Sequence, residues 1–183
     1  MMMLNSFCYL WNYRRKQFST PYPPPAGDIN TNMKNILDKE GKQEIISRLD
    51  KLTEDTPRRW GTMAVNEMLA HMNDAIKISL GMKPAVDKSN FFSRNVTFNV
   101  GVYVLPLWPK GEATAPELDQ KVQGTKARDF YTELEFTKKM LDIFEEREES
   151  KFHPHPMFGK LTKKQWADLL YKHFQHHLRQ FGV

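Results

Sequence analysis

The chain has 183 residues and a mass of 21.5 kDa, which is room for one domain with its own hydrophobic core. Hydrophobic residues make up 40% and charged residues 27%, as in soluble globular proteins, and the formal net charge is +5. Lysines and arginines are interspersed with acids instead of forming a basic stripe, so we expect no nucleic-acid partner. The single cysteine, Cys8, excludes an intrachain disulfide and a cysteine-based zinc site, and it predicts a reducing, cytoplasmic location.

The N-terminal segment, residues 1–32, differs in composition from the rest of the chain. A mildly apolar stretch over residues 1–10 precedes the basic cluster of residues 14–16, which reverses the order found in a secretory signal. A proline-rich segment follows, as in extended linkers. We therefore expect residues 1–32 to be a disordered tail and linker, with a membrane-associating tail as the alternative and Met33 as an alternative start. The helical domain is expected over residues 33–183.

Four segments carry apolar residues at helical spacing. They predict helices over residues 35–53, 64–80, 129–148 and 162–181. Gly41 weakens the first turns of the first helix because glycine is a poor helix former. Thr162 and Gln165 form a capping-box pattern at the start of the fourth helix.

A long connection separates the second and third helices. Within it, residues 90–107 are apolar, but Arg94 and Asn95 make the stretch too polar and too short to span a membrane. We interpret it as a short buried helix, and a strand is the alternative because the stretch is rich in β-branched and aromatic residues. The pattern as a whole predicts an all-α fold, a four-helix bundle with a long crossover between helices two and three.

The fourth helix carries two histidines on its apolar face. Since each residue turns the helix by about 100°, His173 and His177 fall about 20° to either side of the direction of Trp166. Their rings therefore lie one turn apart on the same side, a spacing that lets two imidazoles reach one metal ion. Hydrogen bonds to carbonyls or carboxylates would also satisfy such buried rings. His176 falls at the margin of the apolar face and is expected to be exposed or to support the pair.

Other candidate residues have two interpretations each. His71 lies on a flank of the second helix, where it is either a metal ligand or a boundary residue in contact with solvent. Glu67, one turn earlier, either orients the His71 ring or is a solvated acid. His153 and His155 lie in a His-Pro-His-Pro loop, where we favour a stiff local turn over a proton shuttle. We expect the ending over residues 179–182 to dock the C-terminus rather than to bind substrate.

Three stretches carry a resemblance to a known family. They are Trp60-Gly61-Thr62-Met63 before Met68-Leu69-Ala70-His71, then residues 155–161 before Gln165-Trp166, and the ending over residues 171–182. Together they resemble the DinB/YfiT-like metalloenzyme superfamily, and most closely a branch of it catalogued as a domain of unknown function. The resemblance covers about residues 33–183.

The resemblance implies a four-helix bundle with a divalent metal held by His71, His173 and His177. Three neutral nitrogens leave a coordination position open, as in catalytic sites. Imidazole ligands suit zinc, nickel, iron or copper; zinc and nickel are favoured here, with iron or manganese as alternatives.

The function expected from this site is that of a metal-dependent enzyme of the thiol-transferase or hydrolase type. Its partner would be a small-molecule substrate such as a low-molecular-weight thiol. We expect it to bind neither nucleic acid nor a membrane, and the chain could form a homodimer. The alternatives are a non-catalytic protein whose metal stabilises the bundle, and a helical module without metal.

Overall fold

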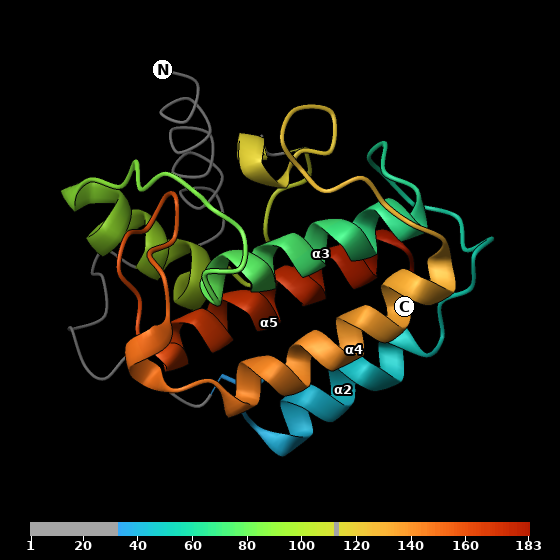
Figure 1. Cartoon of the computed structure of the whole chain (residues 1–183), viewed down its shortest axis with the longest axis horizontal. Coiled ribbons are helices and arrows are strands. Elements are labelled where there is room, and N and C mark those ends of the chain that lie inside the picture. Colours follow the sequence, from blue (N-terminus) through green and yellow to red (C-terminus); the bar gives the residue numbers. More distant parts are fainter. Residues whose placement is uncertain (1–32, 112–113) are drawn as a thin grey trace, which may run out of the picture. The chain divides into compact units, whose positions relative to one another are not determined.

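The structure, a computed structural model, describes residues 33–111 and 114–183. The described part contains four α-helices and no strand, so the all-α prediction is confirmed (Figure 1). The helices are α2 (Lys39–Leu49), α3 (Val65–Ser79), α4 (Phe130–Glu146) and α5 (Lys163–Gln180). None of the helices in these ranges is long and apolar enough to cross a membrane. The prediction for residues 1–32 lies outside the described residues.

The core forms where the apolar faces of the four helices meet. Helix α3 packs along α4, and α5 contacts both α2 and α3 (Figure 1). The largest fully buried side chains of α5 are Trp166 and Phe174, both on the apolar stripe that the sequence predicts. Burying an aromatic side chain of this kind stabilises the fold by about 1.5–3 kcal/mol.

The helix ends follow their capping residues. The Oγ1 of Thr162 accepts a hydrogen bond from the backbone N–H of Gln165, and the Gln165 side chain accepts one from the N–H of Thr162. This is the predicted capping box, and α5 begins one residue later. The Asp129 side chain caps α4 in the same way, by accepting from the N–H of Thr132.

Helix α2 begins four residues later than predicted, at Lys39. The side chain of Asn35 accepts hydrogen bonds from the N–H groups of Leu37 and Asp38, which fixes a turn in place of the first helical turn. Gly41 packs against this turn, since a Cβ at Gly41 would lie 2.1 Å from the Asn35 carbonyl oxygen. Close packing against this turn therefore explains why a glycine lies at position 41, although glycine is a poor helix former.

The crossover is helical, as predicted, but it is wider than an α-helix and mostly not buried. It contains the π-helical turns η1 (Ser93–Thr97) and η2 (Val100–Val104). The amide of Asn99 donates to the Asn95 carbonyl, where a backbone N–H would bond in an α-helix, and such competition favours wider turns. Only Phe98 and Val102 of this stretch are buried. The prediction of a buried helix is wrong, because the crossover covers the other helices from one side only.

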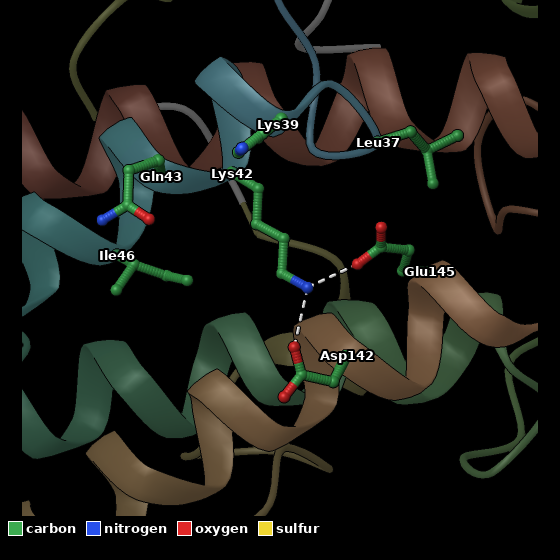
Figure 2. A pocket seen from close by; sticks show the side chains of 7 residues that line it. All are labelled: Leu37, Lys39, Lys42, Gln43, Ile46, Asp142 and Glu145. Carbon is green, nitrogen blue, oxygen red and sulfur yellow. Dashed lines mark hydrogen bonds and ion pairs between the residues drawn. The ribbon is translucent and has the colours of Figure 1, made fainter.

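An open surface groove of about 430 Å³ lies between α2 and α4 (Figure 2). Within it, the Nζ of Lys42 lies 2.7 Å from Asp142 and 2.5 Å from Glu145, which ties the two helices together. Partial burial alone would lower the pKa of Lys42, but the hydrogen bonds to both acids outweigh it and hold the pKa above its ordinary value. None of the histidines named above lines this groove.

Candidate metal centre

His71 is buried, with 3% of its surface exposed. Its flank of α3 is covered by the short turn η3 (Pro116–Leu118), which contacts α3. Twelve of the fifteen residues of α3 are buried, so this helix has core on almost every side. The sequence stripe alone left His71 on a boundary because it could not reveal the loop that covers that flank.

His71, His173 and His177 converge, and we call them the histidine cluster. The Nε2 of His173 lies 2.9 Å from the Nε2 of His71 and 3.0 Å from the Nε2 of His177. One ring nitrogen of each residue lies within 4.8 Å of the other two, so the cluster could hold a metal ion. Helix α5 supplies two of these rings from adjacent turns, and α3 supplies the third from a position 102 residues earlier than His173.

The proton positions on two of the rings are set by their other nitrogens. The Nδ1 of His71 lies 3.0 Å from the carbonyl oxygen of Leu118. A carbonyl oxygen can only accept, so His71 carries its proton on Nδ1 and donates it there. The Nε2 of His71 therefore presents a lone pair to the centre of the cluster.

Gln180 sets the proton of His177 in the same way. The amide nitrogen of Gln180 donates to the Trp60 carbonyl at 2.9 Å, so its oxygen points the other way, 2.9 Å from the Nδ1 of His177. The Nδ1 of His177 is therefore the donor, and its Nε2 also presents a lone pair. Gln180 is buried, with 3% of its surface exposed.

His173 is the half-buried member of the cluster and faces both lone pairs. If its Nε2 carries a proton, it can make a full hydrogen bond to only one of its two partners. If its Nε2 is unprotonated, three lone pairs face one another. In either case a buried acceptor is left unsatisfied, and a cation at the centre would satisfy all three nitrogens.

All three imidazoles are held in the neutral form that a metal requires. Burial lowers the pKa of His71, although the hydrogen bond to Leu118 and the charge of Asp74 act in the opposite direction. Burial lowers the pKa of His173 and of His177 well below the ordinary value, and the neighbouring histidines add to this effect. The three rings are therefore uncharged at neutral pH, as the binding of a metal ion requires.

Comparison with known proteins places the chain in a family. The family model described as "Protein of unknown function (DUF1569)" matches residues 31–182. The chain belongs to the DUF1569 family. This agrees with the resemblance of the sequence to a domain of unknown function. No curated protein and no solved structure matches the chain.

The remaining candidate residues of this DUF1569 protein have local roles. The carboxylate of Glu67 accepts the N–H of Ala64 at 2.7 Å and so caps α3, while both ring nitrogens of His71 have other partners. Of the two interpretations of Glu67, the structure therefore favours the helix acid. The Nδ1 of His155 accepts the N–H of Met157 at 3.0 Å, and burial lowers the pKa of His155 to about 3. These contacts agree with a local turn, since a proton shuttle needs a pKa near neutrality.

Two groups that support the cluster escape the sequence analysis. Leu118 acts through its backbone carbonyl, for which a sequence pattern gives no signal. Gln180 could have been found, since it follows His177 by three residues and such pairs lie side by side on a helix. The prediction that residues 179–182 dock the C-terminus is incomplete: the Gln180 carbonyl does accept the N–H of Arg59, but its side chain orients a candidate ligand.

Proposed function

We propose that this protein is a divalent-metal-dependent enzyme of the thiol-transferase or hydrolase type, with His71, His173 and His177 as the metal ligands. The observation that carries the proposal is the convergence of three Nε2 atoms, two of which have their lone pairs turned inward by hydrogen bonds at Nδ1. Carbonyl and amide groups that orient ligating histidines in this way are typical of metal sites.

The spacing of the nitrogens fits such an ion. Zinc–nitrogen bonds of about 2.05 Å at tetrahedral angles separate two ligand nitrogens by about 3.4 Å. The Nε2 separations of 2.9 Å and 3.0 Å need to grow only slightly, through small rotations of the rings. Three nitrogens leave one coordination position free, and His173 lies at the half-buried side from which a ligand would enter. A divalent ion there would lower the pKa of a water or thiol and so supply a nucleophile at neutral pH.

We further propose that the helices form the four-helix bundle of the DinB/YfiT-like superfamily. Support comes from the resemblance of the stretches around His71 and His177, and from the supply of the cluster by α3 and α5. Zinc or nickel is the favoured ion because imidazole is the ligand type of all three residues. A small thiol is the substrate class to screen first, and a cytoplasmic location suits such a substrate.

Metal analysis tests the ligand assignment. Protein purified without a histidine tag should contain close to one equivalent of a divalent ion by mass spectrometry, and His71→Ala and His177→Ala should lose it. His153→Ala is the matched control, because it removes a histidine outside the cluster and should keep the ion. Full metal content in the His177→Ala variant would refute the assignment.

A metal that only stabilises the fold is the second candidate. The cluster joins α3 to α5, and its supporting bonds reach the loops at Trp60 and Leu118, so an ion would hold four segments together. In this case, a chelator should lower the melting temperature by several degrees, while a screen of small thiols and esters should detect no turnover. Turnover that requires the ion would exclude this alternative.

A further inference from the structure

Basic side chains gather beside the histidine cluster on the last turns of α5. Lys172, His176 and Arg179 recur at steps of four and three residues, so they lie along one edge of the helix, next to the face that carries His173. The same three residues line a shallow hollow with Trp108. With a volume of about 10 Å³, the hollow has room for about one water, so a larger ligand would lie across its rim.

Arg179 is the donor of this rim that is free to take a ligand. Among residues 33–111 and 114–183, its guanidinium has no hydrogen bond or ion pair. Lys172, by contrast, donates from Nζ to the Leu105 carbonyl at 2.5 Å. A guanidinium without a partner presents a planar fork of donors that matches a carboxylate.

Aromatic rings connect the rim to the cluster. The indole of Trp108 lies 5.6 Å from the ring of His173 and 5.9 Å from the ring of His176, measured between centroids. A hydrogen bond of 2.8 Å from its Nε1 to the Gly101 carbonyl fixes the indole in this position. Lys110 adds a further positive charge nearby, with its Nζ 4.5 Å from the ring centroid of Trp60, which in turn packs against His176.

One described carboxylate, that of Glu44, bonds to a residue lining the hollow: it accepts from Gln175 at 2.6 Å, and it is also paired with Lys34 and Arg48. No carboxylate lines the hollow in the part of the chain that the structure describes. The charges of Asp74 and Asp119 act on His71, where they raise its pKa. The Asp74 carboxylate also forms an ion pair with Lys83 and accepts a hydrogen bond from the N–H of Thr125. Three neutral imidazoles would leave the double charge of a bound ion uncompensated as well, which favours an anionic ligand.

We propose that this rim recognises the carboxylate of a small anionic substrate, with Arg179 as its main binding residue and Trp108 against its apolar body. The inference rests on the proposed function, because the other end of the substrate would reach the ion. Arg179 follows His173 by six residues, which corresponds to about 9 Å along the helix axis. The substrate class is therefore an elongated molecule with a donor atom at one end and a carboxylate at the other.

Two thiols of equal length test this proposal. The probes are 6-mercaptohexanoate and the neutral 6-mercaptohexan-1-ol, added to protein loaded with Co²⁺, whose thiolate absorption band reports binding of the sulfur. We expect the carboxylate probe to bind about tenfold more tightly, as hydrogen bonds to charged groups imply. Arg179→Gln should abolish this preference, while Lys139→Gln, which removes an exposed charge from α4, should keep it.

The outcomes separate the two proposals. If the wild-type protein takes up no Co²⁺, the proposed function fails and this inference fails with it. If Co²⁺ binds but the two thiols have equal dissociation constants, the carboxylate inference alone is overturned. A preference that survives Arg179→Gln, in a variant with an unchanged melting temperature, also overturns it.

Discussion

Gln180 offers the sharpest test of how the cluster is built. Its side chain makes two buried hydrogen bonds, one that accepts from the Nδ1 of His177 and one that donates to the Trp60 carbonyl. Gln180→Leu removes both bonds, whereas Gln180→Glu keeps an acceptor for His177 and loses only the donor to Trp60. The pair of variants therefore separates the orientation of a metal ligand from the anchoring of a loop.

The expected magnitudes follow from these bonds. Loss of a group that orients a metal-binding histidine weakens metal affinity by about 10- to 100-fold, so we expect this loss for Gln180→Leu. Gln180→Glu should bind the metal at least as tightly as the wild type, because a carboxylate is a stronger acceptor. Each buried partner left unsatisfied costs about 1–3 kcal/mol, so without metal both variants should be less stable than the wild type.

Competition with a chromophoric chelator at pH 7.5 measures the affinities, and urea unfolding in the presence of EDTA measures the stabilities. If Gln180→Leu lost stability but kept the wild-type affinity, Gln180 would only anchor the loop. The reasoning would also fail if Gln180→Glu bound the metal as weakly as Gln180→Leu, since the acceptor at Nδ1 would then be irrelevant.

Two further predictions concern stability. Folding lowers the pKa values of the histidine cluster, so below about pH 6.5 the unfolded chain binds more protons than the folded chain. The free energy of unfolding of the metal-free protein should therefore fall as the pH drops from about 7 to about 5. Urea titrations in EDTA measure this, and a flat profile would contradict buried neutral rings. Gly41→Ala should destabilise the protein by about 1 kcal/mol or more, because the added Cβ would meet the Asn35 carbonyl oxygen. Its control, Gly101→Ala, adds a Cβ with nothing within 4 Å and should stabilise the crossover by about 0.5–1 kcal/mol; equal effects of the two changes would contradict the packing argument.

Much of the fold follows from local patterns in the sequence. The capping box at Thr162 and the apolar stripe through Trp166 predict α5 to within a residue at each end. The start of α2 was predicted less well, because Asn35 bonds to the backbone of the residues after it, and a count of apolar residues does not register this competition. Between the two π-helical turns, the Asn99 side chain likewise bonds to a backbone carbonyl, that of Asn95, which a count of apolar residues does not register either.

The candidate site, too, could be predicted only in part from local patterns. The inward direction of His173 and His177 follows from helical periodicity within one helix. The placement of His71 depends on the turn at Leu118, which covers α3 from 47 residues further along the chain. Helical periodicity predicts the direction in which a side chain points from its helix. It does not predict which flank of the helix another segment will cover, so His71 was selected as a ligand only by the resemblance to a family.

The support of the cluster also limits what stability measurements can reveal about function. The orienting bonds at Leu118 and Gln180 hold two lone pairs toward the centre, whether or not an ion is there. The metal-free fold therefore retains at least one unsatisfied buried acceptor, and an ion that satisfies it stabilises the protein through linkage. A catalytic ion and a structural ion would both produce this stabilisation. Turnover, and the binding of a ligand at a free coordination position of the ion, are the measurements that separate them.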